Sequence, residues 1–293
     1  MQGGVPHTPP RRAWSILVSI SPHHTLMRPA VALRESGIAL RAALRYCAEH
    51  PSPKHVHQLR TYTRRIEALL ELLPHIPQLP ATSRESARFR KAVHSTRKAT
   101  GATRDLDVLL NLLATLPHQN GKEFAMGVAQ LTVKLENRRD RAAEKLTKRI
   151  ASMGGKLLHA LDKLETALAP ARGVSTNAAE IDRIAREHFH RTAARSTHHS
   201  LKVSPDKLHD IRKSAKRTRY LAEFAEGAPR SKVAHTAQRF HTVQEKIGAW
   251  HDWILLTKFA RKYFGDDHAL CKALQEREQR SHAAALRAAA KLL

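Results

Sequence analysis

The chain has 293 residues, and its 51 Lys and Arg against 26 Asp and Glu give it a formal net charge of +25 with the 20 histidines neutral. Hydrophobic residues make up 42% of the chain, which is enough to bury a core and excludes a disordered basic tail. Aromatic residues are only 5%, and there are only 12 Gly and 14 Pro. This composition favours helices over a β-sandwich or barrel, so we expect an all-α protein.

The cysteine content and the longest apolar runs exclude several further classes. Cys47 and Cys271 are far apart in a chain without a Cys-x-x-Cys motif, which argues against a disulfide framework and a cysteine-rich zinc site. No apolar run approaches 18 residues, so no spanning helix is expected. Residues 1–29 are rich in Pro and His and are predicted to be a flexible tail or a wrongly assigned start. We expect a cytoplasmic protein without a membrane partner.

From residue 30 onward, apolar residues recur at three- and four-residue spacing, which is typical of amphipathic helices. Pro and Gly clusters mark the predicted breaks between them, including Gly227 to Pro229 and Gly248. The segment from Pro170 to Asn177 is the best linker, and it separates a first helical unit, 30–170, from a second, 178–293. The predicted helices are 30–49, 53–73, 83–100, 104–116, 121–168, 178–199, 205–226, 230–247, 250–264 and 267–292.

The two units also match each other in sequence. Residues 52–71 align without gaps on 204–223 with seven identities in 20 positions. A second block pairs 101–105 with 248–252, and both segments begin with Gly-Ala. Two matching blocks in the same order indicate an internal duplication.

The first block carries a stripe of basic residues. Ser52 and Pro53 are a good N-cap and first residue for its helix. His57, Arg60 and Arg64 then follow at i, i+3 and i+7, which stacks them on one face. Like charges in this arrangement repel, and the same pattern in both halves argues against an ordinary solvated face. The two stripes consist of His57, Arg60, Arg64 and Arg65, and of His209, Arg212 and Lys216 flanked by Arg217 and Arg219.

If the two halves pack about a pseudo-twofold axis, the stripes converge on a concave, positively charged channel. Arg and Lys side chains suit phosphate oxygens, so a polyanion is the natural ligand. The sequence shows no zinc finger, evident recognition helix or aromatic residue among the first stripe's cations. This pattern favours polyphosphate, with nucleic acid as the alternative.

The motifs His57-Gln-Leu-Arg60-x3-Arg64-Arg65 and Gly101-Ala-Thr-Arg104-Asp105, with their repeats, resemble the CHAD domain over about residues 28–290. The resemblance implies two four-helix bundles related by a pseudo-twofold axis, with a central basic channel that binds inorganic polyphosphate and targeting to polyphosphate granules. It implies a structural role for Asp105 and Asp252. It places polyphosphate contacts on both stripes, and on weaker candidates in the helices before the Gly turns: His94, Arg97, Lys98, Arg239 and Lys246.

No motif points to catalysis. The strand motif Glu-x-Glu-x-Lys of a triphosphate tunnel domain is missing, its nearest match being 276–280, and there is no phosphate-binding loop of an NTPase. The paired histidines lack the His-Glu-x-x-His pattern, so neither a metal site nor a cofactor is expected. We therefore expect a binding protein and not an enzyme, with a phosphotransferase or polyphosphate hydrolase as the less favoured alternative.

Overall fold

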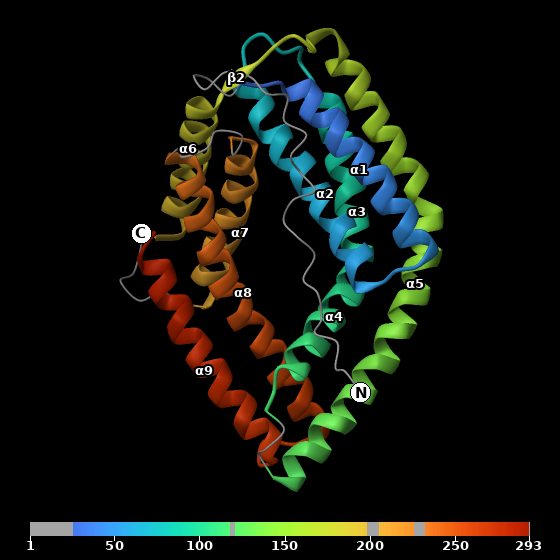
Figure 1. The fold of residues 1–293 in the computed structure, drawn as a ribbon, viewed down its shortest axis with the longest axis vertical. Helices are drawn as coiled ribbons and strands as arrows, with labels where there is room; N and C mark the ends of the chain where they lie inside the picture. The colour runs from blue at the N-terminus through green and yellow to red at the C-terminus, as the bar shows by residue number, and fades with distance from the viewer. Residues whose placement is uncertain (1–25, 118–120, 198–204, 226–231, 293) are drawn as a thin grey trace, which may run out of the picture.

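The computed structural model describes residues 26–117, 121–197, 205–225 and 232–292, and these are mostly helical, as predicted (Figure 1). The described helices are α1 (Pro29–Glu49), α2 (Pro53–Leu72), α3 (Ser83–Ala99), α4 (Gly101–Ala114), α5 (Lys122–Leu168), α6 (Ala178–Thr197), α7 (Pro205–Ala222), α8 (Lys232–Phe264) and α9 (Ala269–Ala290). Three short 3₁₀ turns follow α2, α5 and α7: η1 (Leu73–His75), η2 (Ala169–Ala171) and η3 (Glu223–Ala225). Within the described ranges, none of the helices is both long and apolar enough to span a bilayer.

The predicted helix boundaries agree closely with the structure, except at Gly248. There the predicted break is wrong, because α8 continues unbroken from Lys232 to Phe264. A glycine in a helix interior costs only about 1 kcal/mol, which packing readily offsets. At the matching place in the first half, Thr100 separates α3 from α4. The predicted break at 227–229 lies outside the described residues.

The end of the predicted tail and the predicted linker are joined by a small antiparallel sheet. Strand β1 (Leu26–Met27) pairs with β2 (Thr176–Asn177), so that Leu26 faces Asn177 and Met27 faces Thr176. Helix α1 begins at Pro29, so the last four residues of the predicted tail are structured. Residues 1–25 lie outside the described part of the chain.

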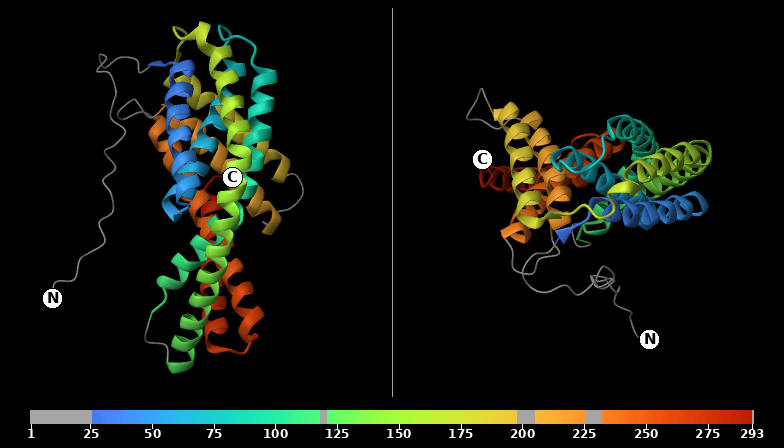
Figure 2. Two further views of the ribbon diagram at one scale, coloured as in Figure 1. Left: turned by 90° about the vertical axis from the view of Figure 1, so that its right-hand side faces the viewer. Right: turned by 90° about the horizontal axis from the view of Figure 1, so that it is seen from above.

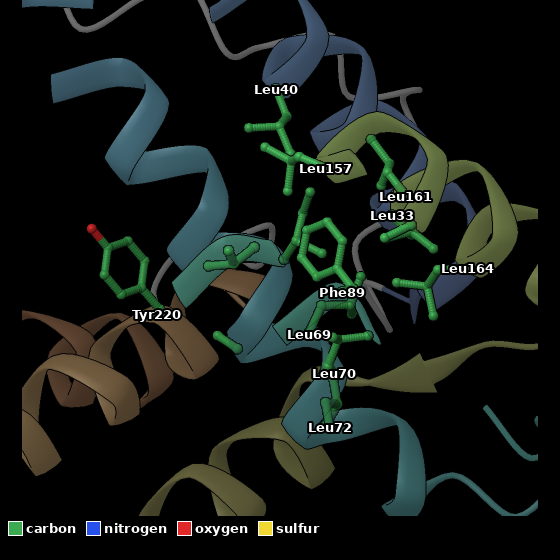
Figure 3. Packing of buried hydrophobic residues seen from close by; sticks show 14 of the residues in the cluster. Leu33, Leu40, Leu69, Leu70, Leu72, Phe89, Leu157, Leu161, Leu164 and Tyr220 are labelled. Carbon is green, nitrogen blue, oxygen red and sulfur yellow. The ribbon is translucent and has the colours of Figure 1, made fainter. Parts of the chain in front are cut away.

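The first apolar core packs α1, α2 and α3 against the C-terminal part of α5, and α6, α7 and α8 also contribute residues to it (Figure 3). Helix α2 begins as predicted, because the Ser52 side chain accepts a hydrogen bond from the backbone N–H of His55 over 3.2 Å and Pro53 follows it. Its apolar stripe is fully buried. The core includes Leu33, Leu40, Leu69, Leu70, Phe89, Leu157 and Leu161.

Two further cores hold the remaining helices together. One consists of residues from α6, α7, the part of α8 up to Trp250 and the C-terminal half of α9, including Phe189, Ile211 and Phe240. The other, here termed the distal core, combines α4 and the start of α5 with the end of α8 and the start of α9, including Leu109, Leu131, Leu135, Leu256 and Leu270. Both the first core and the distal core take residues from the two sequence halves, so the buried apolar residues form three clusters and not one cluster per half.

The two sequence halves contact each other along the first core and at further places. Helices α2 and α7 pack against each other near the middle of the molecule, and the distal core joins the halves at one end (Figure 1). Viewed from above, α6 and α7 lie on one side, and α1, α3 and the upper part of α5 lie on the other (Figure 2). The two predicted basic stripes are on the helices that meet in the middle, α2 and α7.

Candidate functional site

The contact between α2 and α7 brings cations of the two predicted stripes together. The apolar faces of these helices are buried in the cores through Val56 and Leu59 on α2 and through Leu208 and Ile211 on α7. The cations are on neighbouring faces, which leaves them at the junction between the helices. We refer to Arg60, Arg64, Arg212 and Lys216 as the basic cluster, because each of the three arginines acts electrostatically on Lys216.

Lys216 is the most strongly perturbed member of the basic cluster. Burial, together with the charges of Arg64, Arg212, Arg60 and Arg219, lowers its pKa to about 6. Among the described residues, its amine has no hydrogen bond or ion pair. In the protein without ligand, the Lys216 amine is therefore mostly neutral near pH 7. A bound anion would favour its protonation.

Arg60 is held in place by the junction between α3 and α4. Its Nη1 donates hydrogen bonds to the Arg97 carbonyl and to the Thr100 hydroxyl, both over 2.9 Å. Burial and the neighbouring Arg64 lower its pKa to about 10, although the Asp105 carboxylate opposes this shift. Arg60 thus has a structural role as well as a place in the cluster.

Arg64 is half-buried and hydrogen-bonded to Tyr220 of α7. Burial lowers the pKa of Arg64, and Tyr220 acts in the opposite direction. The Tyr220 side chain is 4% exposed, and its hydroxyl points away from the leucine side chains of the first core (Figure 3). Tyr220 therefore anchors one stripe to the helix that carries the other.

The guanidinium of Arg212 lies against Gly248 of α8. A Cβ atom at position 248 would be 3.4 Å from Arg212 Nε, at ordinary van der Waals distance, so this side chain packs directly on the glycine. The Nε atom is buried and has no hydrogen-bond partner among the described residues. The glycine that looked like a helix break in the sequence instead faces a residue of the basic cluster.

The two predicted histidines are exposed beside the cluster. Each has a neighbour from the second pair of matching segments, 101–105 and 248–252. Desolvation lowers the pKa of His57, and the charges of Arg104 and Arg64 lower it further. Desolvation also lowers the pKa of His209, and the charges of Lys213 and His251 lower it further. The ring centre of His251 is 6.2 Å from that of His209. Both imidazoles therefore protonate less readily than a free histidine.

Arg104 of α4 is a member of this environment that the sequence analysis did not include among the site residues. Its charge helps to lower the pKa of both His57 and Arg60. A signal was present, because the repeat alignment pairs Arg104 with His251, the neighbour of His209. Asp105 lies close by and close to Asp252, and burial raises its pKa, as does the charge of Asp252.

Several other predicted cations are engaged elsewhere. Arg97 lies near Arg60 and Arg64 but is ion-paired with Glu67. Arg219 Nε is 3.2 Å from Glu223 Oε1, and its guanidinium lies 4.4 Å from the Tyr220 ring centre. These two arginines therefore carry partly neutralised charge.

The remaining candidates lie at the edges of the cluster or far from it. Arg239 donates a hydrogen bond to the Lys291 carbonyl over 2.9 Å, at the C-terminal end of α9, and is not part of the cluster. The charge of Arg217 works to lower the pKa of the Glu67 carboxyl, and the charge of Arg65 works to lower the pKa of the Tyr62 hydroxyl. The structure leaves His94, Lys98 and Lys246 exposed on α3 and α8. In the described part of the chain, no three His, Cys, Asp or Glu side chains gather into a possible metal site.

Comparison with known proteins places this arrangement in a family. The crystal structure of the CHAD domain from the plant Ricinus communis matches with a TM-score of 0.62 and 19% identity, over 91% of this chain and 88% of that chain. PptA from Streptomyces chartreusis matches with a TM-score of 0.52 and 18% identity, over 89% of this chain and 95% of that chain. At such identities the likeness concerns the fold alone, and no curated protein sequence matches. The family model for the CHAD domain matches residues 36–261, most of the chain, which confirms the predicted resemblance. The chain belongs to the CHAD domain family.

Proposed function

We propose that the protein binds inorganic polyphosphate at the basic cluster, without catalysing a reaction. The observation that carries this proposal is the convergence of Arg60, Arg64, Arg212 and Lys216 from two helices, with no acidic partner for the Lys216 amine among the described residues. Like charges gathered in a half-buried place destabilise the free protein. A polyanion offsets this repulsion and accepts charge-assisted hydrogen bonds from the arginines.

The aromatic surroundings of the cluster favour polyphosphate over nucleic acid. Tyr220 adjoins the cluster, but it is 4% exposed and Arg219 covers its ring. Proteins that bind single-stranded nucleic acid commonly use open aromatic rings on which bases stack. A chain of bare phosphates needs only positive charge and hydrogen-bond donors, which the cluster supplies.

The proposal includes an origin for the paired stripes. α1–α5 and α6–α9 derive from a duplicated unit and are related by a pseudo-twofold axis, so that the equivalent helices α2 and α7 meet in a basic channel. The repeat alignment supports this, because it pairs Arg60 with Arg212 and Arg64 with Lys216. In the cell, such a protein would associate with cytoplasmic polyphosphate granules.

The test measures the affinity for long-chain polyphosphate at fixed low salt in two double variants. Arg64→Gln with Lys216→Gln removes one arginine from the cluster and the amine that a bound anion would protonate. Lys145→Gln with Arg149→Gln removes two exposed cations from α5 and is the matched control. We expect the cluster variant to lose at least about 100-fold in affinity, since each of the two charge-assisted contacts contributes about 1.5–3 kcal/mol. Equal losses in the two variants would show that net charge, and not the cluster, determines binding.

Two further measurements separate this function from its alternatives. Duplex DNA and RNA at equal phosphate concentration should compete with bound polyphosphate far less well than free polyphosphate does. If either competes equally well, the protein is a general nucleic-acid binder. Incubation with Mg²⁺ and polyphosphate should leave the chain length unchanged, and shortening that disappears in His57→Ala would identify an enzyme.

A further inference from the structure

Arg219, a flanking cation of the second stripe, is tied to a histidine of the next helix. Its Nη1 lies at hydrogen-bond distance from Nδ1 of His241 on α8, 2.9 Å away. Its Nε is 3.2 Å from Glu223 Oε1, but this N–H makes no hydrogen bond. Among the described residues, His241 is therefore the hydrogen-bond partner of Arg219.

This bond determines which nitrogen of His241 carries the proton. A guanidinium only donates hydrogen bonds, so Nδ1 of His241 must accept and carries no proton. The imidazole proton is then on Nε2, which is 3.1 Å from Oε1 of Glu245. The charged groups around the ring are thus Arg219 and Glu223, from α7 and the η3 turn, and Glu245 from α8 itself. Only the neutral ring can hold Arg219, because a protonated Nδ1 donates and does not accept.

Arg219 lies next to the basic cluster. Its guanidinium is 4.4 Å from the ring centre of Tyr220, and Tyr220 is hydrogen-bonded to Arg64 of the cluster. The charge of Arg219 also acts on Lys216. A guanidinium released from His241 would therefore lie beside the anion that the cluster binds.

We infer that His241 is a pH-dependent restraint on Arg219: the neutral ring holds the guanidinium, and protonation of the ring releases it to bind phosphate at the basic cluster. Release follows because an imidazolium offers the guanidinium no acceptor and repels it. Glu245 remains a partner for Nε2 in either state. The effect on binding rests on the proposed function, whereas the restraint itself does not. Arg219 thus adds to polyphosphate binding as the pH falls.

The matching place in the first half is built differently. The repeat alignment pairs Arg219 with Glu67, which is ion-paired with Arg97 of α3. That contact joins α2 to α3 through two oppositely charged side chains and without a histidine. The restraint is therefore a feature of the second half, where an arginine stands in place of the glutamate.

The first experiment measures the affinity for polyphosphate at pH 8. His241→Ala removes an uncharged ring, yet affinity should rise at least about threefold, because the freed guanidinium forms charge-assisted hydrogen bonds with phosphate. The same change in an Arg219→Gln protein should have no effect. His159→Ala, at an exposed histidine of α5, is the matched control and should leave the affinity unchanged. If His241→Ala keeps its helical content by circular dichroism but binds no more tightly than the parent, the inference is wrong.

A second experiment observes the restraint without a ligand. NMR of ¹⁵N-labelled protein at pH 8 should show the proton of His241 on Nε2, and the His241→Ala variant assigns the signal. Acidification should add a proton at Nδ1 and shift the side-chain signals of Arg219 together with it. A proton on Nδ1 at pH 8 would overturn the restraint.

The two experiments together distinguish this inference from the proposed function. If NMR shows the expected tautomer and the linked shift of Arg219, but the parent protein does not bind polyphosphate, the restraint is supported and the proposed function fails. If the parent binds polyphosphate and His241→Ala does not bind it more tightly, the restraint fails and the proposed function stands.

Discussion

Arg60 on α2 donates a hydrogen bond to the carbonyl oxygen of Arg97, in the last turn of α3, over 2.9 Å. The same nitrogen donates to the hydroxyl of Thr100, the residue that separates α3 from α4. The last carbonyl groups of a helix have no partner within that helix. A residue of the basic cluster therefore also completes the end of α3.

Replacing Arg60 should cost stability as well as affinity. Arg60→Gln removes the donor to the Arg97 carbonyl, and we expect the free energy of unfolding to fall by about 1–3 kcal/mol. Urea unfolding followed by circular dichroism measures this change. Lys98→Gln, an exposed cation in the same turn of α3, should change the stability by less than about 0.5 kcal/mol. Similar losses in both variants would contradict a specific role for the hydrogen bond.

Replacing Lys216 should have opposite effects on stability and binding. Lys216→Met keeps much of the side-chain volume but removes the amine that four arginines repel. We expect the free energy of unfolding without ligand to rise by about 0.5–2 kcal/mol, as is common when a functional site is relieved of strain. Affinity for polyphosphate should fall in the same variant. A destabilised Lys216→Met protein would show that the amine has a stabilising partner.

The affinity for polyphosphate should rise as the pH falls from 8 to 6. The Lys216 pKa of about 6 in the free protein means that the amine is largely neutral at pH 8 and at pH 7 and becomes partly protonated towards pH 6. Bound phosphate raises that pKa, so binding takes up a proton, and the affinity gains up to about tenfold per pH unit for each proton. His57 and His209, whose pKa values are also lowered, add to the effect at the acidic end.

Lys216→Arg provides the control for this pH dependence, because arginine remains charged throughout. We expect its affinity to vary much less between pH 8 and 7 than that of the parent protein. Calorimetry in two buffers with different ionisation enthalpies counts the protons taken up. An equally steep profile in Lys216→Arg would assign the titration to another group.

The distal core should make the chain unfold as one unit. Leu135 is completely buried there, and Leu135→Ala should lower the free energy of unfolding by about 2–5 kcal/mol. Val133→Ala on the same helix, at a side chain 56% exposed, should have little effect. Helical content and tryptophan fluorescence should change together in both variants. Two separate transitions would mean that the halves are stable independently.

The helices and the basic stripes are predictable from sequence because both depend on local periodicity. Three- and four-residue spacing places apolar residues on one face and cations on another, whatever the helix packs against. The prediction failed at Gly248 because a glycine marks a break only when nothing else supports the helix. In the structure, α8 passes through this position, and the side chain of Arg212 packs on Gly248.

Pairing between distant residues was not predictable in the same way. Whether a cation of the stripe stays unpaired depends on which helix packs beside it, as Arg97 with Glu67 and Arg239 with the Lys291 carbonyl illustrate. The distal core likewise joins segments far apart in the chain, such as Leu131 and Leu270. The repeat alignment came closest to such information, because it pairs Arg104 with His251.

The distal core also determines the order in which the protein can mature on the ribosome. Helix α4 and the start of α5 are synthesised early, whereas their apolar partners Leu256 and Leu270 belong to α8 and α9, near the end of the chain. At a synthesis rate of about 5–20 residues per second, the apolar face of the early helices waits several seconds for its partners. During that interval we expect the nascent chain to expose this apolar surface, and the distal core to form only after the last helix emerges.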